Sequence, residues 1–250
     1  MVNRWGLSLA AVSIMTLTGP AWSQDAPGTT FDAYNESQAE PIFDMNPAFS
    51  DGSLVLTRTD GTEVVLQREN ESALLKFEND PEVWSLRITP GPGNSELFKN
   101  DTERLFLKLS DRGNMSLYTP EYNGEPVITS SIVDEQLISP PELEKDDFPD
   151  RLTRHLSLRL GRLVNVEIED VGGGQQPWMQ DAALIVSDVV ASNAELSEDI
   201  KAIRLVTGNV PDFKMTEDDT LLVVVDPSTG YDGRPSSDRV YLFLKGAFHG

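Results

Sequence analysis

Short apolar runs separated by turn residues dominate the chain from residue 53 to residue 118. They lie at residues 54–56, 64–66, 73–77, 83–88, 97–98, 104–109 and 115–118. Asp60-Gly61 stands between the first two runs, and an Asp-Gly pair in that position is a strong signal for a β-hairpin. Because the runs are short and closely spaced, they predict an antiparallel β meander in this half of the chain.

Helical periodicity appears in the second half. Leucine recurs at helical spacing at positions 152, 156, 160 and 163, and a second apolar stripe covers residues 178–190. Apolar or alternating runs predict strands at residues 163–168, 200–206, 221–225 and 240–244. The predicted fold class is therefore α+β, with an N-terminal antiparallel β meander packed with or beside a C-terminal layer of two helices and four strands.

The chain divides into five predicted segments. These are a signal peptide at 1–23, a flexible lead-in at 24–50, a β-rich half at 51–119, a linker at 120–147 and an α+β half at 148–250. The linker is rich in proline and ends in an acidic run, which excludes a long helix but leaves room for a short strand at 126–132. Since the linker is short, residues 51–250 are alternatively a single module.

The first 23 residues have the pattern of a secretory signal peptide. Arg4 supplies the positive charge, residues 5–17 are uncharged and largely apolar, and Ala21 and Ser23 give the small-residue cleavage pattern. The apolar run is too short for a membrane-spanning helix, which needs about 20 residues. We expect export to a periplasm or the medium, cleavage after Ser23, and no transmembrane segment in the mature chain.

Composition narrows the possible functions. The 250 residues carry 20 Lys and Arg against 41 Asp and Glu, a net charge of −21, with no cysteine and only two histidines. The absence of cysteine excludes disulfides, cysteine-ligated metals and a thiol nucleophile. Such an acidic chain is not expected to bind nucleic acid, because phosphate contacts need clustered cations. Known serine-hydrolase motifs are also absent from the sequence, so a Ser-His-Asp triad is not expected.

The loop at residues 226–238 is the best candidate for a ligand site. Arg234, Ser236 and Ser237 supply a guanidinium and two hydroxyls, which suit a phosphate, sulfate or carboxylate. Since a strand is predicted after the loop, there is no helix N-terminus to complete a phosphate-binding loop. The alternative is that Arg234 pairs with Asp226 or Asp238 and only stabilises the loop.

The same loop offers oxygen ligands for a metal ion. Asp226, Ser228 and Asp232 are of the type that calcium prefers, although their spacing is not that of an EF-hand. The turn that contains Asp80 and Glu82 is a weaker candidate of the same kind. The expected cofactor is therefore none, or calcium.

Five segments together resemble a known family. They are LKFENDPEV (75–83), PGPG (90–93), LFKND (97–101), LYTP (117–120) and GRPSS (233–237). In this order they resemble an uncharacterised, exported family of alphaproteobacteria that is catalogued as a domain of unknown function. The resemblance covers residues 73–244 and implies an exported protein, but it implies no activity, cofactor or catalytic residue.

Two classes of function remain. We favour a non-enzymatic, exported binding or interaction module, whose partner is an envelope protein or a small anionic ligand. The alternative is a cell-envelope hydrolase that acts through a pair of carboxylates, with or without calcium.

Overall fold

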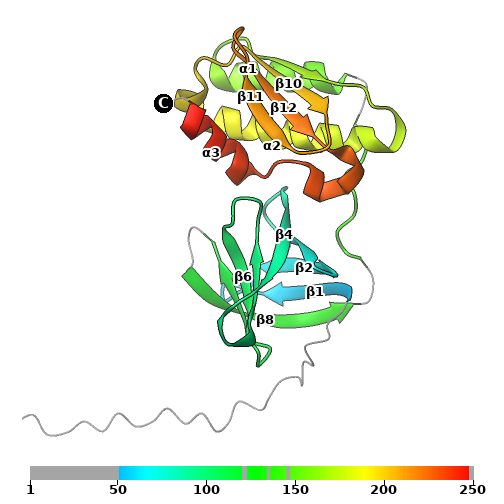
Figure 1. The fold of residues 1–250 in the computed structure, drawn as a ribbon, viewed down its shortest axis with the longest axis vertical. Coiled ribbons are helices and arrows are strands. Elements are labelled where there is room, and N and C mark those ends of the chain that lie inside the picture. Colours follow the sequence, from blue (N-terminus) through cyan, green and yellow to red (C-terminus); the bar gives the residue numbers. More distant parts are fainter. Residues whose placement is uncertain (1–50, 120–122, 134–135, 145–146, 248–250) are drawn as a thin grey trace, which may run out of the picture. The chain divides into compact units, whose positions relative to one another are not determined.

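The computed structural model describes residues 51–119, 123–133, 136–144 and 147–247 (Figure 1). The expected signal peptide and lead-in lie outside the described residues. All described residues fall in one compact unit.

Eight antiparallel strands in the first half form a closed barrel (Figure 1). They are β1 (Asp51–Thr57), β2 (Glu63–Glu69), β3 (Ser72–Phe77), β4 (Val83–Pro90), β5 (Glu96–Lys99), β6 (Leu105–Leu109), β7 (Met115–Tyr118) and β8 (Asn123–Val133), with the short 3-10 helix η1 (Pro92–Asn94) between β4 and β5. Each strand pairs with the next along the chain, and β8 closes the barrel by pairing with β1. Closure removes the unpaired strand edges that an open meander would leave.

Alternation along the strands fills the barrel interior with side chains. In β3, for example, Ala73 and Leu75 are buried while their neighbours are not. Trp84 and Phe106 meet inside with ring centroids 4.6 Å apart. The interior is thus a packed apolar core, as expected for a barrel of this size.

The second half is a four-stranded sheet with helices. Its elements are α1 (Phe148–Leu160), β9 (Asn165–Ile168), α2 (Gln176–Ser192), β10 (Ala202–Thr207), β11 (Asp212–Met215), β12 (Thr220–Val225) and α3 (Ser237–Ala247), with 3-10 helices η2 (Gly173–Gln175), η3 (Ala194–Ser197) and η4 (Pro227–Gly233). The strand order is β11-β12-β10-β9, in which only β11 runs antiparallel to its neighbour.

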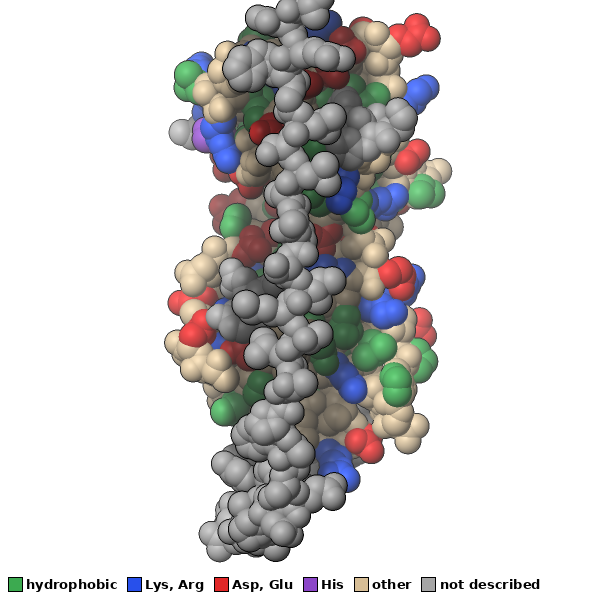
Figure 2. All heavy atoms as spheres, turned by 90° about the vertical axis from the view of Figure 1, so that its left-hand side faces the viewer, with side chains coloured by type: hydrophobic (Ala, Val, Ile, Leu, Met, Phe, Trp, Pro, Cys, Tyr) green, Lys and Arg blue, Asp and Glu red, His purple; other side chains and the backbone are tan. Residues whose placement is uncertain are grey.

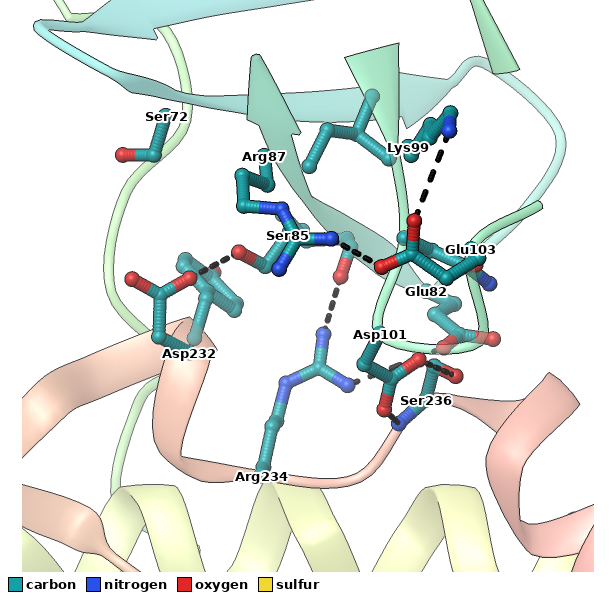
Figure 3. Close-up of a pocket in the computed structure, with 14 residues that line it drawn as sticks. Ser72, Glu82, Ser85, Arg87, Lys99, Asp101, Glu103, Asp232, Arg234 and Ser236 are labelled. Carbon is teal, nitrogen blue, oxygen red and sulfur yellow. Dashed lines mark hydrogen bonds and ion pairs between the residues drawn. The ribbon is translucent and has the colours of Figure 1, made fainter. Parts of the chain in front are cut away.

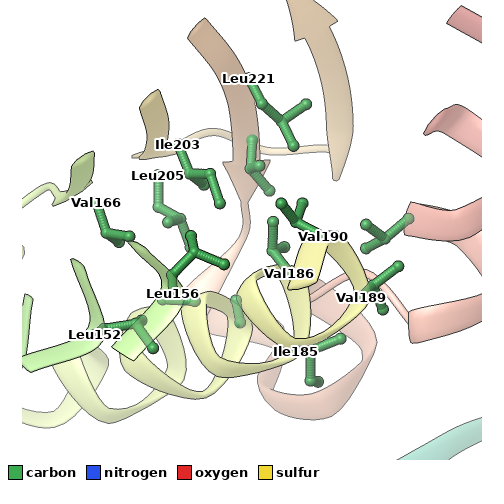
Figure 4. Close-up of a cluster of buried hydrophobic side chains, with 14 of the residues drawn as sticks. Leu152, Leu156, Val166, Ile185, Val186, Val189, Val190, Ile203, Leu205 and Leu221 are labelled. Atoms are coloured by element: carbon green, nitrogen blue, oxygen red, sulfur yellow. The ribbon is translucent and has the colours of Figure 1, made fainter. Parts of the chain in front are cut away.

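The helices pack against one face of this sheet. Leu156 of α1 and Val186 of α2 meet Ile203 of β10 in a buried apolar cluster (Figure 4). The alternate residues of the strands turn away from the cluster. Among them, Arg204 and Glu167 form an exposed ion pair across β10 and β9. The sheet therefore has a helix-covered face and a face with charged residues.

The predicted fold class is wrong. The N-terminal half is a closed eight-stranded barrel with helices elsewhere in the chain, and not a meander combined with a two-helix layer. Closure depends on the pairing of β1 with β8, which places Leu54 opposite Ile132. Local alternation of apolar residues indicates which side chains face inward, but it carries no information on the partner of the first and last strands.

Residues 240–244 form part of helix α3, whereas the sequence predicted a strand there. Val240 and Leu244 are fully buried and lie four residues apart, while Tyr241 and Leu242 between them are exposed. A short apolar run fits either a strand or a helix, and here the packing of one helical face decides.

Strand β11 was not predicted. No helix among the described residues is long and apolar enough to cross a membrane.

Candidate functional site

The loop at residues 226–238 connects β12 to α3 through η4. Asp226 begins η4, because its carboxylate accepts hydrogen bonds from the backbone N–H and the hydroxyl of Ser228, at 3.1 and 2.5 Å. The loop closes on itself where the Asp226 N–H donates to the Gly233 carbonyl at 2.8 Å. A Cβ atom at Gly233 would lie 1.7 Å from the Asp226 carbonyl oxygen, so this close approach requires glycine.

Arg234 lies at the centre of the site and is only 5% exposed. Its Nε atom lies 2.7 Å from Asp181 Oδ2 on α2, and its Nη1 atom lies 3.9 Å from Glu82 Oε1, just before β4. It also donates to the backbone carbonyl of Val83 (Figure 3). The guanidinium therefore binds carboxylates, as its chemistry indicates, but these carboxylates belong to the chain itself and are neither Asp226 nor Asp238.

Ser236 and Ser237 form the N-terminus of α3. Ser236 caps the helix by accepting a hydrogen bond from Arg239 N–H at 3.1 Å, and its hydroxyl donates to Asp101. The backbone N–H of Ser237 donates to Glu82 Oε1 at 3.0 Å. Two carboxylates from the barrel thus satisfy the positive end of the helix.

The first turn of α3 makes a further contact with the barrel. Asp238 accepts hydrogen bonds from Arg104 Nη1, at 2.9 and 3.0 Å, and from Asn100 Nδ2, at 2.8 Å. The Arg104 guanidinium in turn lies over the Phe106 ring, 4.6 Å from its centroid. The loop and the helix that follows it are therefore bonded to the barrel at several points.

Burial changes the titration of the carboxyl groups around Arg234. It raises the pKa of Glu82 from an ordinary value of 4.5 to about 7, and it also raises the pKa of Asp181. One guanidinium serves both carboxyls, and Glu82 is its more distant partner. Glu82 therefore takes up a proton at a much higher pH than an exposed glutamate.

A pocket of about 290 Å³ lies beside Arg234, between strands of the barrel and η4 (Figure 3). Its polar lining includes Ser85 and Arg87 of β4, Lys99 of β5, and Tyr231 and Asp232 of η4. Ser85 donates a hydrogen bond to Asp232. Burial raises the pKa of Tyr231 to about 12, so its hydroxyl stays protonated, and it donates to the backbone carbonyl of Ser139 at 2.8 Å. The volume is at the lower end of the range for small-molecule sites, about 300–1,000 Å³.

A network of exposed charges borders the pocket. Arg87 donates to Glu103, and Lys99 Nζ lies 3.5 Å from the other oxygen of the same carboxylate. Glu103 belongs to the turn between β5 and β6. The pocket thus has two cations from neighbouring strands on one of its sides (Figure 3).

The three candidate metal ligands have different partners in the structure. Asp226 and Ser228 bond to each other, whereas Asp232 accepts from Ser85 of the barrel. Within the described ranges, no group of three or more His, Asp or Glu side chains is placed to hold a metal ion.

A family model described as a domain of unknown function (DUF4908) matches residues 51–244. The chain belongs to this family. The expectation of a family of unknown function is confirmed, and the match begins before residue 73, where the resemblance began. Neither the curated proteins nor the solved structures that were compared give a match.

Sequence reasoning missed most of the partners that define the site. It singled out Arg234, Ser236 and Ser237, and it noted Glu82 only as part of a weak metal candidate. Asp181 lies on the predicted second helix, opposite the apolar stripe, where a solvent-exposed acid is expected. Only the contact between segments remote in sequence reveals that it faces Arg234.

Replacing Arg234 with alanine should lower the free energy of unfolding by about 3–5 kcal/mol, because it leaves the buried Glu82 and the half-buried Asp181 without their cation. Arg204→Ala is the matched control, since the Arg204–Glu167 pair is exposed and should contribute less than about 1 kcal/mol. Urea unfolding of the two variants measures the difference. Equal losses in both would contradict the central role of the buried pair.

Glu82→Gln should change how stability depends on pH. Since the pKa of Glu82 is higher in the folded than in the unfolded chain, its contribution to the free energy of unfolding is full below about pH 4.5 and is lost as pH rises towards about 7. Unfolding of the wild type and the variant between pH 4.5 and 8 tests this. In the Glu82→Gln variant, this part of the fall in stability should disappear, whereas a Glu71→Gln variant, which changes an exposed glutamate elsewhere in the barrel half, should retain it.

Proposed function

We propose that this protein is an exported, non-enzymatic binding module that holds a small polar molecule in the pocket beside Arg234. The observation that carries the proposal is the pocket itself, which combines a suitable volume with hydrogen-bonding groups on rigid strands. Ser85 and Arg87 project from β4, and Lys99 projects from β5. Groups on strands are positioned more accurately than groups on loops, which favours specific binding.

The non-enzymatic part of the proposal rests on the chemistry of the lining residues. A serine nucleophile normally needs a histidine as its base, and no histidine is among the described residues that line the pocket. His155 is exposed on α1. The hydroxyls of Ser85 and Ser236 already donate to carboxylates.

A hydrolase that uses a pair of carboxylates is the second candidate, and one observation favours it. Glu82 lines the pocket and has a pKa of about 7, which suits a general acid at neutral pH. Against this stands the hydrogen bond from Ser237 N–H to Glu82, which explains the side chain as part of the contact between the barrel and α3.

Export is supported by the sequence of residues 1–23. The charge of the chain is also compatible with a soluble binding module. Although the net charge is −21, acidic and basic side chains lie interspersed on the face drawn in Figure 2. Ligand selection therefore depends on local side chains more than on the net charge.

Binding should appear in a screen of three pools, which contain anionic, cationic and neutral small molecules, by saturation-transfer NMR. Ser85→Trp should weaken any specific binding at least about tenfold, because the indole fills the pocket. Ser116→Trp is the matched control, a half-buried serine of β7 that does not line the pocket. Loss of binding in both variants, or no binding from any pool, would contradict the proposal. Turnover that Glu82→Gln abolishes would favour the hydrolase.

Expression in a bacterial host should yield an exported protein that begins at Gln24. Mass spectrometry of the exported fraction measures the new N-terminus. Ser23→Tyr should block cleavage, because signal peptidase accepts only small residues there. Ala33→Tyr, beyond the cleavage site, should be processed normally. An uncleaved wild-type protein in the cytoplasm would overturn the export proposal.

A further inference from the structure

We propose that the ligand of this pocket carries an anionic group, a carboxylate or a phosphate, which binds between Arg87 and Lys99 and displaces the carboxylate of Glu103. This inference rests on the proposed function, because it names the class of ligand for the same pocket.

The first observation is the pairing of the two cations. Arg87 of β4 and Lys99 of β5 are directly opposite each other in the antiparallel ladder, so both side chains leave the same face of the sheet. Directly opposed residues have Cβ atoms about 4.5–5.5 Å apart, and like charges in that position repel each other. An anion between them removes the repulsion. The pair is therefore a preformed site for a negatively charged group.

The second observation is that the chain already places a carboxylate there. Glu103 contacts both cations through its two oxygens. The hydrogen bond from Arg87 lowers the pKa of Glu103, which shows that the two cations stabilise the ionised form of a carboxyl group. A carboxylate or phosphate from a ligand presents the same oxygen atoms to the same donors.

The third observation concerns the backbone of Glu103. Its φ angle is +64°, a left-handed conformation that is uncommon for residues other than glycine and asparagine. The turn around it is fixed by Asn100, whose side-chain oxygen accepts hydrogen bonds from Thr102 and from Arg104 N–H. A strained residue in a well-ordered turn at the edge of a pocket is typical of a functional position. Here the turn holds the Glu103 carboxylate over the cations.

The contact that Glu103 makes is easily exchanged. The side chains of Arg87 and Glu103 are each 60% exposed, and ion pairs between exposed side chains are weak. An incoming anion needs no rearrangement of the barrel, because Arg87 and Lys99 remain on their strands. A phosphate or a bidentate carboxylate forms a stronger contact with a guanidinium than a single glutamate oxygen does.

The rest of the pocket defines how such a ligand lies. Asp232 and Asp101 also line the pocket and accept hydrogen bonds from Ser85 and Ser236, whereas Glu103 is the carboxylate that contacts the cation pair (Figure 3). An anionic group avoids these carboxylates and is directed to Arg87 and Lys99. The uncharged part of the ligand then faces Ser72, Ser85 and Tyr231. The site therefore fits a small molecule with an anionic group at one end and hydroxyl groups at the other.

Titration calorimetry at low ionic strength tests the inference with inorganic phosphate and with succinate as separate probes. Glu103→Gln should tighten binding of the better probe at least about threefold, because it removes the internal competitor while leaving the cations in place. Arg87→Gln and Lys99→Gln should each weaken it about tenfold or more. The exposed Arg112→Gln, which removes one positive charge outside the pocket, controls for the change in net charge. Comparison of the two probes shows whether the anionic group is a phosphate or a carboxylate.

Three results together support the inference. The probe binds more tightly to Glu103→Gln, it binds more weakly to Arg87→Gln and Lys99→Gln, and its affinity for Arg112→Gln is unchanged. Equal weakening in Arg112→Gln overturns it, because the probe then responds only to net charge. A third outcome separates the two proposals. If a neutral or cationic molecule binds, and Ser85→Trp abolishes this binding while Glu103→Gln and Arg87→Gln leave it unchanged, the anionic ligand is ruled out. The proposed binding function then still stands. Thermal unfolding of each variant confirms that the protein is folded.

Discussion

The buried Arg234 is the interaction on which the rest of the site depends. It forms ion pairs with Asp181 of α2 and Glu82 of the barrel and donates to the Val83 carbonyl, so its own loop, α2 and the barrel meet at one guanidinium. A buried cation needs its charge balanced, and the two carboxyl groups that balance it meet Arg234 only when all three segments are in place. These contacts of Arg234 fix the position of the loop between β12 and α3, and this loop forms one wall of the pocket.

Ion pairs between carboxylates and cations occur both in the contacts that hold the pocket together and at its exposed edge, but their burial differs. The buried Glu82 contacts both Arg234 and the N-terminus of α3, and burial raises its pKa into the neutral range. On the other side of the pocket, the exposed Arg87 and Glu103 form an ion pair that water weakens, and the half-buried Lys99 contacts the same carboxylate. Contacts that are strong because they are buried maintain the structure, and contacts that are weak because they are exposed remain available for exchange with a ligand.

Sequence reasoning succeeded where a property is local. Periodicity placed most of the strands and the first two helices. The prediction was wrong at residues 240–244, where a short apolar run fits a strand or a helix equally well. Because a strand was predicted there, the helix N-terminus that Ser236 caps was not expected. Sequence reasoning could not nominate Glu82 or Asp181 as the partners of Arg234 from among 41 acidic residues.

By itself, the sequence determined the apolar runs and stripes that form most of the strands and the first two helices, the acidic composition without cysteine, and the secretory pattern of its first residues, because each of these depends on residues a few positions apart. Only the tertiary structure decided that β8 closes a barrel with β1, that Arg87 lies opposite Lys99, and that Arg234 is neutralised by Glu82 and Asp181. These contacts join positions distant in sequence, and their free energy depends on burial and on geometry that exist only in the folded chain.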